Sequence, residues 1–337
     1  MQVQVRAGVQ SGVADSVPIR PARAQGISYD PVAAHTQNAL LWLVMRMVRW
    51  VVTFRKAVLL AFEHDMLNTA KAAAYSGMLM LFPTMVVVTT LLALVPEGSS
   101  IMGQIRITFM NFLPADTYTL LLSSMQTRRF QSAQLVFSAV TLSVFAGLGM
   151  MLSLMEGFRR AYRLPRTEWG FWERRLRALL LVPIVHVPLA LATLLLVFGH
   201  QIEHWMVENS AHELRHAVLF FWRTVRWAIA LVTSLTVLGA LYHFGTRRKE
   251  HWSHVMPGAI GATAVWFPAT LAFGWYVTTF ANYSRFYGPF GAGIATLVWL
   301  YLTSFSALLG AELNGVLFRA RMEQEANLDV PETFISR

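Results

Sequence analysis

The sequence predicts an all-α integral membrane protein with six transmembrane helices and an N-terminal amphipathic interfacial helix. Hydrophobic residues make up 55% of the 337 residues, and charged residues make up only 14%. The charged fraction is little more than half of that in a typical soluble domain. Six segments are apolar over the roughly 20 residues that a helix needs to cross a bilayer. The chain has no cysteine, which excludes disulfides, iron–sulfur clusters and cysteine nucleophiles.

The chain begins with a polar tail followed by an amphipathic segment. Residues 1–37 are polar, contain three prolines and lack the apolar stretch of a signal peptide, so we expect a disordered cytoplasmic tail. Residues 38–72 are expected to form an interfacial helix, because four polar residues recur at helical spacing on one face: Arg46, Arg49, Thr53 and Lys56. A seventh span is the alternative, disfavoured by the cost of placing arginines in the bilayer centre.

The transmembrane domain is expected at 73–318, with a cytoplasmic tail at 319–337. Its six spans are expected at 73–95, 134–155, 178–198, 218–244, 255–281 and 290–317. Four prolines lie inside these spans: Pro83, Pro183, Pro188 and Pro268. Proline removes a helix hydrogen bond and kinks or breaks a helix, and broken helices occur at transporter binding sites. A purely structural role for each proline is the alternative.

Positive charges predict the orientation of the spans. The segments on one side, namely the N-terminal region, the second and fourth connections and the C-terminal tail, hold 21 of the 28 Lys and Arg residues, and those on the other side hold five. Cytoplasmic segments carry the excess of Lys and Arg, so both termini are expected in the cytoplasm. The net charge of +10 is explained by this bias, and we expect no nucleic-acid partner.

Three motifs resemble the YihY/BrkB family of bacterial inner-membrane proteins. The sequences Ala72-Ala73-Ala74-Tyr75 and Leu81-Phe82-Pro83 are similar to its first span, and Glu156-Gly157-Phe158-Arg159-Arg160-Ala161-Tyr162, with Phe171-Trp172 and Arg174-Arg175, is similar to its basic loop. The run from Tyr287-Gly288-Pro289-Phe290-Gly291 through Trp299-Leu300-Tyr301-Leu302 to Leu309-Gly310-Ala311-Glu312-Leu313 is similar to its closing segment. The resemblance covers about residues 40–318. It implies six helices, the bacterial inner membrane, cytoplasmic termini and a role in lipid or envelope-precursor transport. Members have also carried the label ribonuclease BN and a link to virulence and serum resistance.

Polar residues at membrane depth are candidates for binding an anionic substrate. Guanidinium groups can bind phosphate or carboxylate through two parallel hydrogen bonds, and two arginines lie within the fourth span. The candidate substrate-binding residues are Arg223, Arg226, Glu312, Glu156, Lys71 and Asn314. They predict a polar route lined by the arginines towards the outside and by Glu312 towards the cytoplasm. Arginines that reach the outer interface, and pairs that only lock the bundle, are the alternatives.

Four histidines occur near the connection between the third and fourth spans. His200 and His204 belong to an H-x-x-E-H pattern, and His212 and His216 to an H-E-x-x-H pattern. Histidines at i and i+4 share a helix face and can bind one divalent metal such as zinc. A wet loop rich in histidine is the alternative, and no other cofactor is indicated.

These observations favour transport or handling of an anionic amphipathic substrate, such as a phospholipid or envelope precursor, over catalysis. Membrane lipids are the expected partners, with other envelope proteins or self-association as further candidates. A membrane-bound metal-dependent hydrolase that uses the external histidines is the alternative. A ribonuclease is more remote, because the cytoplasmic loops offer no acidic cluster for Mg²⁺.

Overall fold

The computed structural model describes residues 31–92, 133–165, 169–208, 215–247, 250–279 and 289–328. In these residues the fold is entirely helical, with seven helices and no strand. The chain divides into two compact units, Met1–Arg49 and Trp50–Arg337. The larger unit contains the six apolar helices.

The first helix, α1 (Pro31–Glu63), is longer at its start than the sequence indicated. It begins at Pro31, a residue favoured at the first position of a helix, so residues 31–37 are helical rather than part of the polar tail. It ends at a turn formed by His64 and Asp65, and Asp65 has a left-handed backbone with φ of 59°. The expected boundary at residue 72 therefore lies inside the next helix, which begins at Met66.

Six further helices are long and apolar enough to cross a membrane, which confirms the predicted fold class. They are α2 (Met66–Leu92), α5 (Ala133–Ala161), α6 (Phe171–Glu208), α7 (Arg215–Gly245), α8 (Trp252–Thr279) and α10 (Pro289–Leu328). Each overlaps one of the predicted spans. The last helix continues to Leu328, so the first half of the expected C-terminal tail is helical.

The outer faces of these helices are apolar. Phe82 of α2, Phe137 of α5 and Trp275 of α8 are 64%, 73% and 61% exposed. A soluble protein rarely leaves so much contiguous apolar surface in water, whereas lipid tails solvate it without cost. The exposure thus agrees with the sequence in placing this surface against the bilayer.

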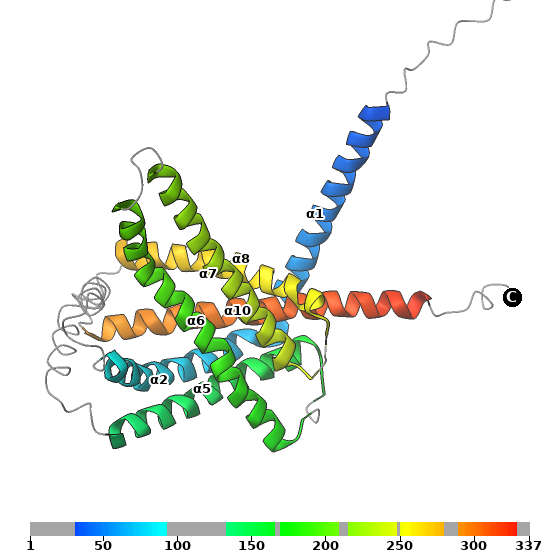
Figure 1. Cartoon of the computed structure of the whole chain (residues 1–337). Helices are drawn as coiled ribbons and strands as arrows, with labels where there is room; N and C mark the ends of the chain where they lie inside the picture. The colour runs from blue at the N-terminus through cyan, green and yellow to red at the C-terminus, as the bar shows by residue number, and fades with distance from the viewer. Residues whose placement is uncertain are drawn as a thin grey trace, which may run out of the picture. The chain divides into compact units, whose positions relative to one another are not determined.

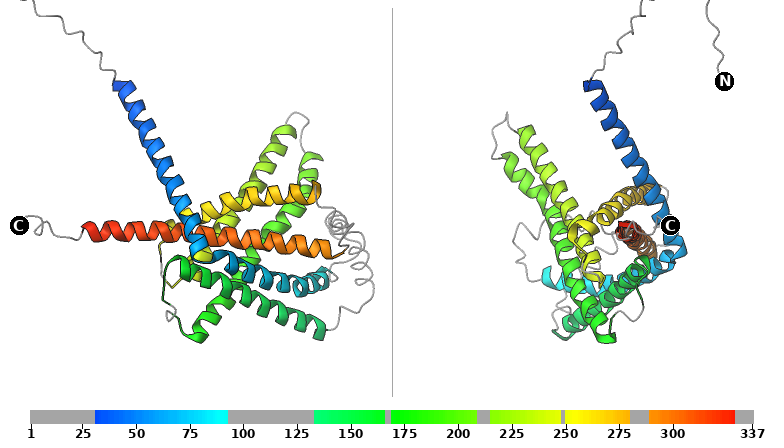
Figure 2. Two further views of the ribbon diagram at one scale, coloured as in Figure 1. Left: turned by 180° about the vertical axis from the view of Figure 1, so that it is seen from behind. Right: turned by 90° about the vertical axis from the view of Figure 1, so that its right-hand side faces the viewer.

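Three helices pack on α10: α8 and α2 run antiparallel to it and α5 runs parallel to it (Figure 1). The other two, α6 and α7, pack on each other, with α6 also on α5 and α7 also on α8. In the α2–α5 pair, the Thr84 and Ser143 hydroxyls lie 2.7 Å apart. Near the other end of the pair, a Cβ on Gly157 would lie 3.2 Å from the Thr69 side chain. Small residues let membrane helices approach closely. Seen from the side in Figure 2, α10 lies between α8 and the α2–α5 pair.

One end of the bundle gathers the arginine–carboxylate ion pairs that join described residues of α5 and α6, and we call it the basic end. It comprises the turn at 64–65, the described residues of the connection between α5 and α6, and the described residues of the connection between α7 and α8. The last two turns of α1 also reach it, because Ala57 and Leu60 pack on Leu313 and Val316 of α10. Part of the expected interfacial helix is therefore packed on protein.

Candidate functional site

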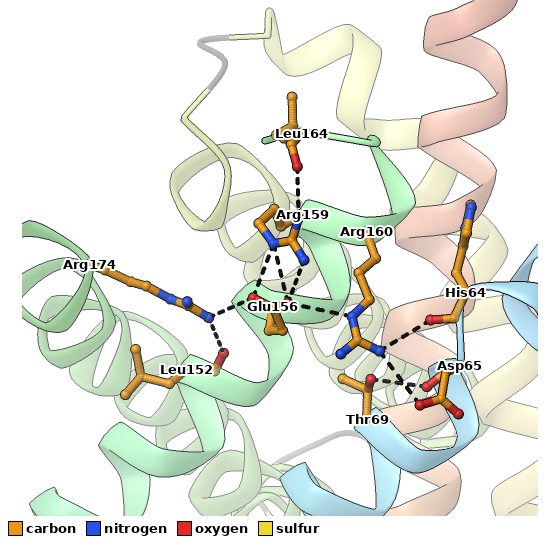
Figure 3. Close-up of polar contacts among 9 residues, drawn as sticks. All are labelled: His64, Asp65, Thr69, Leu152, Glu156, Arg159, Arg160, Leu164 and Arg174. Atoms are coloured by element: carbon orange, nitrogen blue, oxygen red, sulfur yellow. Dashed lines mark hydrogen bonds and ion pairs between the residues drawn. The ribbon is translucent and has the colours of Figure 1, made fainter. Parts of the chain in front are cut away.

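Glu156 is the centre of an ion-pair cluster at the basic end (Figure 3). It lies in the last turns of α5, and its carboxylate accepts from Arg159 Nη2 at 2.6 Å and from Arg174 Nη2 of α6 at 3.0 Å. Arg160 Nε lies 3.5 Å from the same carboxylate. Arg159 and Arg160 meet Glu156 because residues three and four apart share a helix face. The predicted site residue Glu156 thus holds three arginines in fixed positions.

The cluster also orders the end of α5. Arg163 has a left-handed backbone with φ of 54°, and the amide of Leu164 donates to the Arg159 carbonyl at 2.9 Å. This six-to-one hydrogen bond is the one that ends many helices. Arg159 Nη1 then donates to the Leu164 carbonyl at 2.8 Å. The next residue after the helix, Tyr162, is buried, and burial raises the pKa of its hydroxyl.

A cavity of about 350 Å³ opens beside this cluster. Its polar lining comes from three elements: Arg159 of α5, Arg174 and Arg175 of α6 with the preceding Trp169, and Thr246 and Arg247 after α7. The guanidinium of Arg175 stacks on the Phe171 ring at 3.5 Å. Trp169 Nε1 is buried and has no hydrogen-bond partner in the described part of the chain. Four arginines therefore line the cavity, and this positive charge suits an anion.

Glu312 is fully buried in α10 and contacts the turn between α1 and α2. Its Oε1 lies 2.6 Å from His64 Nδ1. A carboxylate can only accept, so Nδ1 carries the hydrogen whenever Glu312 is ionised. The second oxygen, Oε2, has no hydrogen-bond partner among the described residues. The contact joins the half-buried His64 to the buried Glu312 and so ties the turn to α10.

Asn314 bridges α10 to the start of α8. Its Oδ1 accepts from the Gly258 amide at 2.7 Å, and its Nδ2 donates to the Val255 carbonyl at 2.9 Å. A Cβ on Gly258 would collide with the Asn314 amide, so only glycine permits this approach. Asn314 therefore uses both ends of its side chain to join two helices.

The other predicted binding residues lie apart from the cavity. Lys71 is exposed on α2 and donates to Asn68 at 3.1 Å. Arg223 and Arg226 lie in α7, and Arg226 precedes Gly245 by 19 residues, which is about 28 Å along a helix. Gly245 itself lies at the basic end, where a Cβ would contact Phe158 of α5. The structure thus places Glu156 behind the cavity, in contact with its lining residues Arg159 and Arg174, but leaves the α7 arginines far along the bundle.

The four predicted helix breaks do not interrupt their helices: α2 continues through Pro83, α6 through Pro183 and Pro188, and α8 through Pro268. Of the four histidines, His212 lies outside the described residues. His200 and His204 belong to α6 and His216 to α7, but their side-chain surroundings also lie outside the described part. In that part, the structure contains no group of three metal-ligating side chains.

The sequence pattern of the family described as Virulence factor BrkB matches residues 60–332. The chain belongs to this family. The ribonuclease-like protein YfkH of Bacillus subtilis (strain 168) is 28% identical over 267 residues, which are 78% of this chain and 94% of that protein. UPF0761 membrane proteins of Chromohalobacter salexigens and Azotobacter vinelandii are each 27% identical, over 74% and 73% of this chain. The chain spans only 59% and 58% of the length of those two relatives. No solved structure matches it.

Sequence reasoning identified Glu156 but missed most of the cavity. Arg159, Arg174 and Arg175 were visible as part of a basic loop, and the spacing of Arg159 three residues after Glu156 indicates a helical ion pair. Trp169 and Arg247 carry no local signal, since one precedes α6 and the other follows α7. Only the packing of α6 and α7 on α5 brings them together.

Proposed function

We propose that this membrane protein handles an anionic amphipathic molecule, a phospholipid or an envelope precursor, in the bacterial inner membrane. The arginine-lined cavity at the basic end carries the proposal. It replaces the route along Arg223 and Arg226 as the position of the charged headgroup. Membership of the BrkB family and the names of its membrane-protein relatives agree with a membrane role.

The cavity adjoins lipid-facing surface, and this supports an amphipathic ligand over a soluble anion. At the start of α6, Phe171 and Trp172 are 63% and 78% exposed, and Leu176 and Leu180 are exposed further along. Aromatic side chains at the end of a span belong at the level of the lipid headgroups. A headgroup in the cavity would therefore leave its acyl tails against α6.

The basic end faces the cytoplasm in this proposal, with both termini on that side. The charge asymmetry of 21 against five supports it, because Lys and Arg are enriched in cytoplasmic segments. The ligand headgroup would then be reached from the cytoplasmic leaflet.

A binding experiment tests the site with a matched control. Purified protein in neutral detergent is titrated with dioleoyl phosphatidylglycerol and, separately, with zwitterionic dioleoyl phosphatidylcholine, and bound lipid is counted by native mass spectrometry. We expect preferential binding of the anionic lipid. Arg247→Gln should weaken it about tenfold, because a hydrogen bond to a charged group contributes about 1.5 kcal/mol or more.

The control is Lys71→Gln, which removes a positive charge at the same end of the bundle but away from the cavity. It should bind as the wild type does. Equal binding of the two lipids by the wild type would refute the proposed function, and equal loss in both variants would refute the site. Transport is then tested in proteoliposomes by the rate at which a fluorescent phosphatidylglycerol becomes accessible to a quencher, which Arg247→Gln should reduce.

A further inference from the structure

We infer that the cavity selects a headgroup with two or more negative charges, a terminal phosphate or diphosphate, over a phosphodiester. The inference rests on the proposed function and names the chemistry of the group that the cavity binds. It follows from the balance of charges, the hydrogen-bond donors left over, and the size of the cavity.

The cavity has more positive charge than one phosphodiester can neutralise. Four arginines line it. Among the described residues, one carboxylate pairs with these arginines: Glu156, which binds Arg159 and Arg174. The nearest acidic residue on α6, Glu173, pairs instead with Arg177 at 3.0 Å. Among the described residues, subtracting the one negative charge of Glu156 from the four positive charges leaves an excess of three.

The donors that remain can hold more oxygens than a phosphodiester offers. Arg159 donates to Glu156 and the Leu164 carbonyl through all three of its side-chain nitrogens, so it positions the cluster. Arg174 makes its contacts through Nη2, which leaves Nε and Nη1. Arg247 lines the cavity with an exposed side chain, and Arg175 makes one hydrogen bond to the described residues, from Nη1 to the Phe171 carbonyl at 3.3 Å. A phosphodiester presents two charged oxygens, whereas a phosphate monoester presents three and a diphosphate more.

The start of α6 adds donors of the same kind. The Arg174 amide donates to the Gly170 carbonyl at 3.1 Å, so Gly170 occupies the position before the helix. Glycine has no side chain to cap the amides that follow. Gly170 and Phe171 both line the cavity, and the first amides of a helix favour a phosphate. This N-terminus supports the arginines and does not carry the inference alone.

The size of the cavity points to a compact headgroup. At about 350 Å³, it lies near the lower end of the range for ligand pockets, roughly 300–1,000 Å³. We therefore expect the cavity to bind a small headgroup of high charge density rather than a large glycosylated one.

The experiment compares lipids that share their acyl chains. Dioleoyl phosphatidic acid ends in a phosphate monoester, and dioleoyl phosphatidylglycerol contains a phosphodiester. At pH 8 we expect phosphatidic acid to bind at least tenfold more tightly. At pH 5 most of that preference should disappear, because the second pKa of a phosphate monoester is about 6 while the arginines keep their charge. Binding of phosphatidylglycerol should not change with pH.

Two variants and one soluble probe complete the test. Arg174→Gln leaves Glu156 paired with Arg159, so we expect the variant to fold. It should reduce the preference for phosphatidic acid, as should Arg247→Gln. Lys71→Gln should keep it. If inorganic diphosphate competes with phosphatidic acid, the charged group alone is sufficient for binding. If phosphatidic acid binds and diphosphate does not compete with it, binding requires the lipid as well as the charged headgroup.

The outcomes separate this inference from the proposed function. Equal affinity for the two anionic lipids at pH 8, or a preference that survives both arginine substitutions, would overturn the selection for multiple charge and leave lipid handling intact. Binding of neither lipid would overturn both.

Discussion

Replacing Asn314 with alanine tests whether this residue joins two helices or binds a ligand. The side chain is 1% exposed, and it makes two hydrogen bonds to the α8 backbone, at 2.7 and 2.9 Å. A hydrogen bond of this kind contributes about 1 kcal/mol net, and bonds between membrane helices average somewhat less. We therefore expect Asn314→Ala to reduce the free energy of unfolding by about 2 kcal/mol.

The assay is reversible unfolding in mixed micelles with increasing dodecyl sulfate, followed by circular dichroism. The matched control is Asn68→Ala, because Asn68 is exposed and, among the described residues, its side chain bonds to Asp65 and Lys71 on the surface. Its effect should stay within about 0.5 kcal/mol. Folded Asn314→Ala should bind anionic lipid as the wild type does. Two variants that unfold at the same point, or an Asn314→Ala protein that is stable but no longer binds lipid, would refute the bridging role.

Three further predictions concern packing, orientation and metal. Gly310→Ala places a Cβ 2.5 Å from a carbonyl oxygen of α8 and should destabilise the protein by about 1–3 kcal/mol or more; Gly274→Ala, where a Cβ meets nothing within 4 Å, should be neutral or slightly stabilising by thermal unfolding. In this cysteine-free chain, Ser253→Cys should react with an impermeant maleimide only from the cytoplasmic side and Ser210→Cys only from the opposite side, and the reverse pattern would invert the proposed orientation. If the histidines bind a metal, the purified protein should retain about one zinc ion, and the His200→Ala variant should lose it. Protein that contains no metal and is not stabilised by added zinc would instead support a histidine-rich loop exposed to water.

The sequence contained enough information for the membrane fold because that information is local. A span needs about 20 apolar residues in succession, so length and composition identify each of the six helices without knowledge of its neighbours. The ends of helices were harder to predict. The turn at His64 and Asp65 follows Glu63 in a short polar run that a surface helix could also contain. The break between α1 and α2 was placed at residue 72 instead.

Glu312 and Asn314 show what a single sequence can and cannot predict about buried polar residues. Their polarity within a span predicted a special role, but the sequence named no partner for either. The partners are His64, 248 residues away, and the backbone around Gly258, 56 residues away. Asn314 was predicted to bind substrate because a buried amide looks the same in sequence whether it meets a ligand or a neighbouring helix.

By itself, the sequence determined the number of spans, their apolar composition and the presence of a basic connection after α5. These features depend on composition along short stretches of chain. Only the tertiary structure decided where the positive charge gathers around a cavity. The α7 arginines that the sequence singled out lie about 28 Å along the helix from the basic end, while Arg174 and Arg247 line one cavity with Glu156 behind them. The physical reason is that a cavity is bounded by residues from several helices, and their convergence depends on how the helices cross.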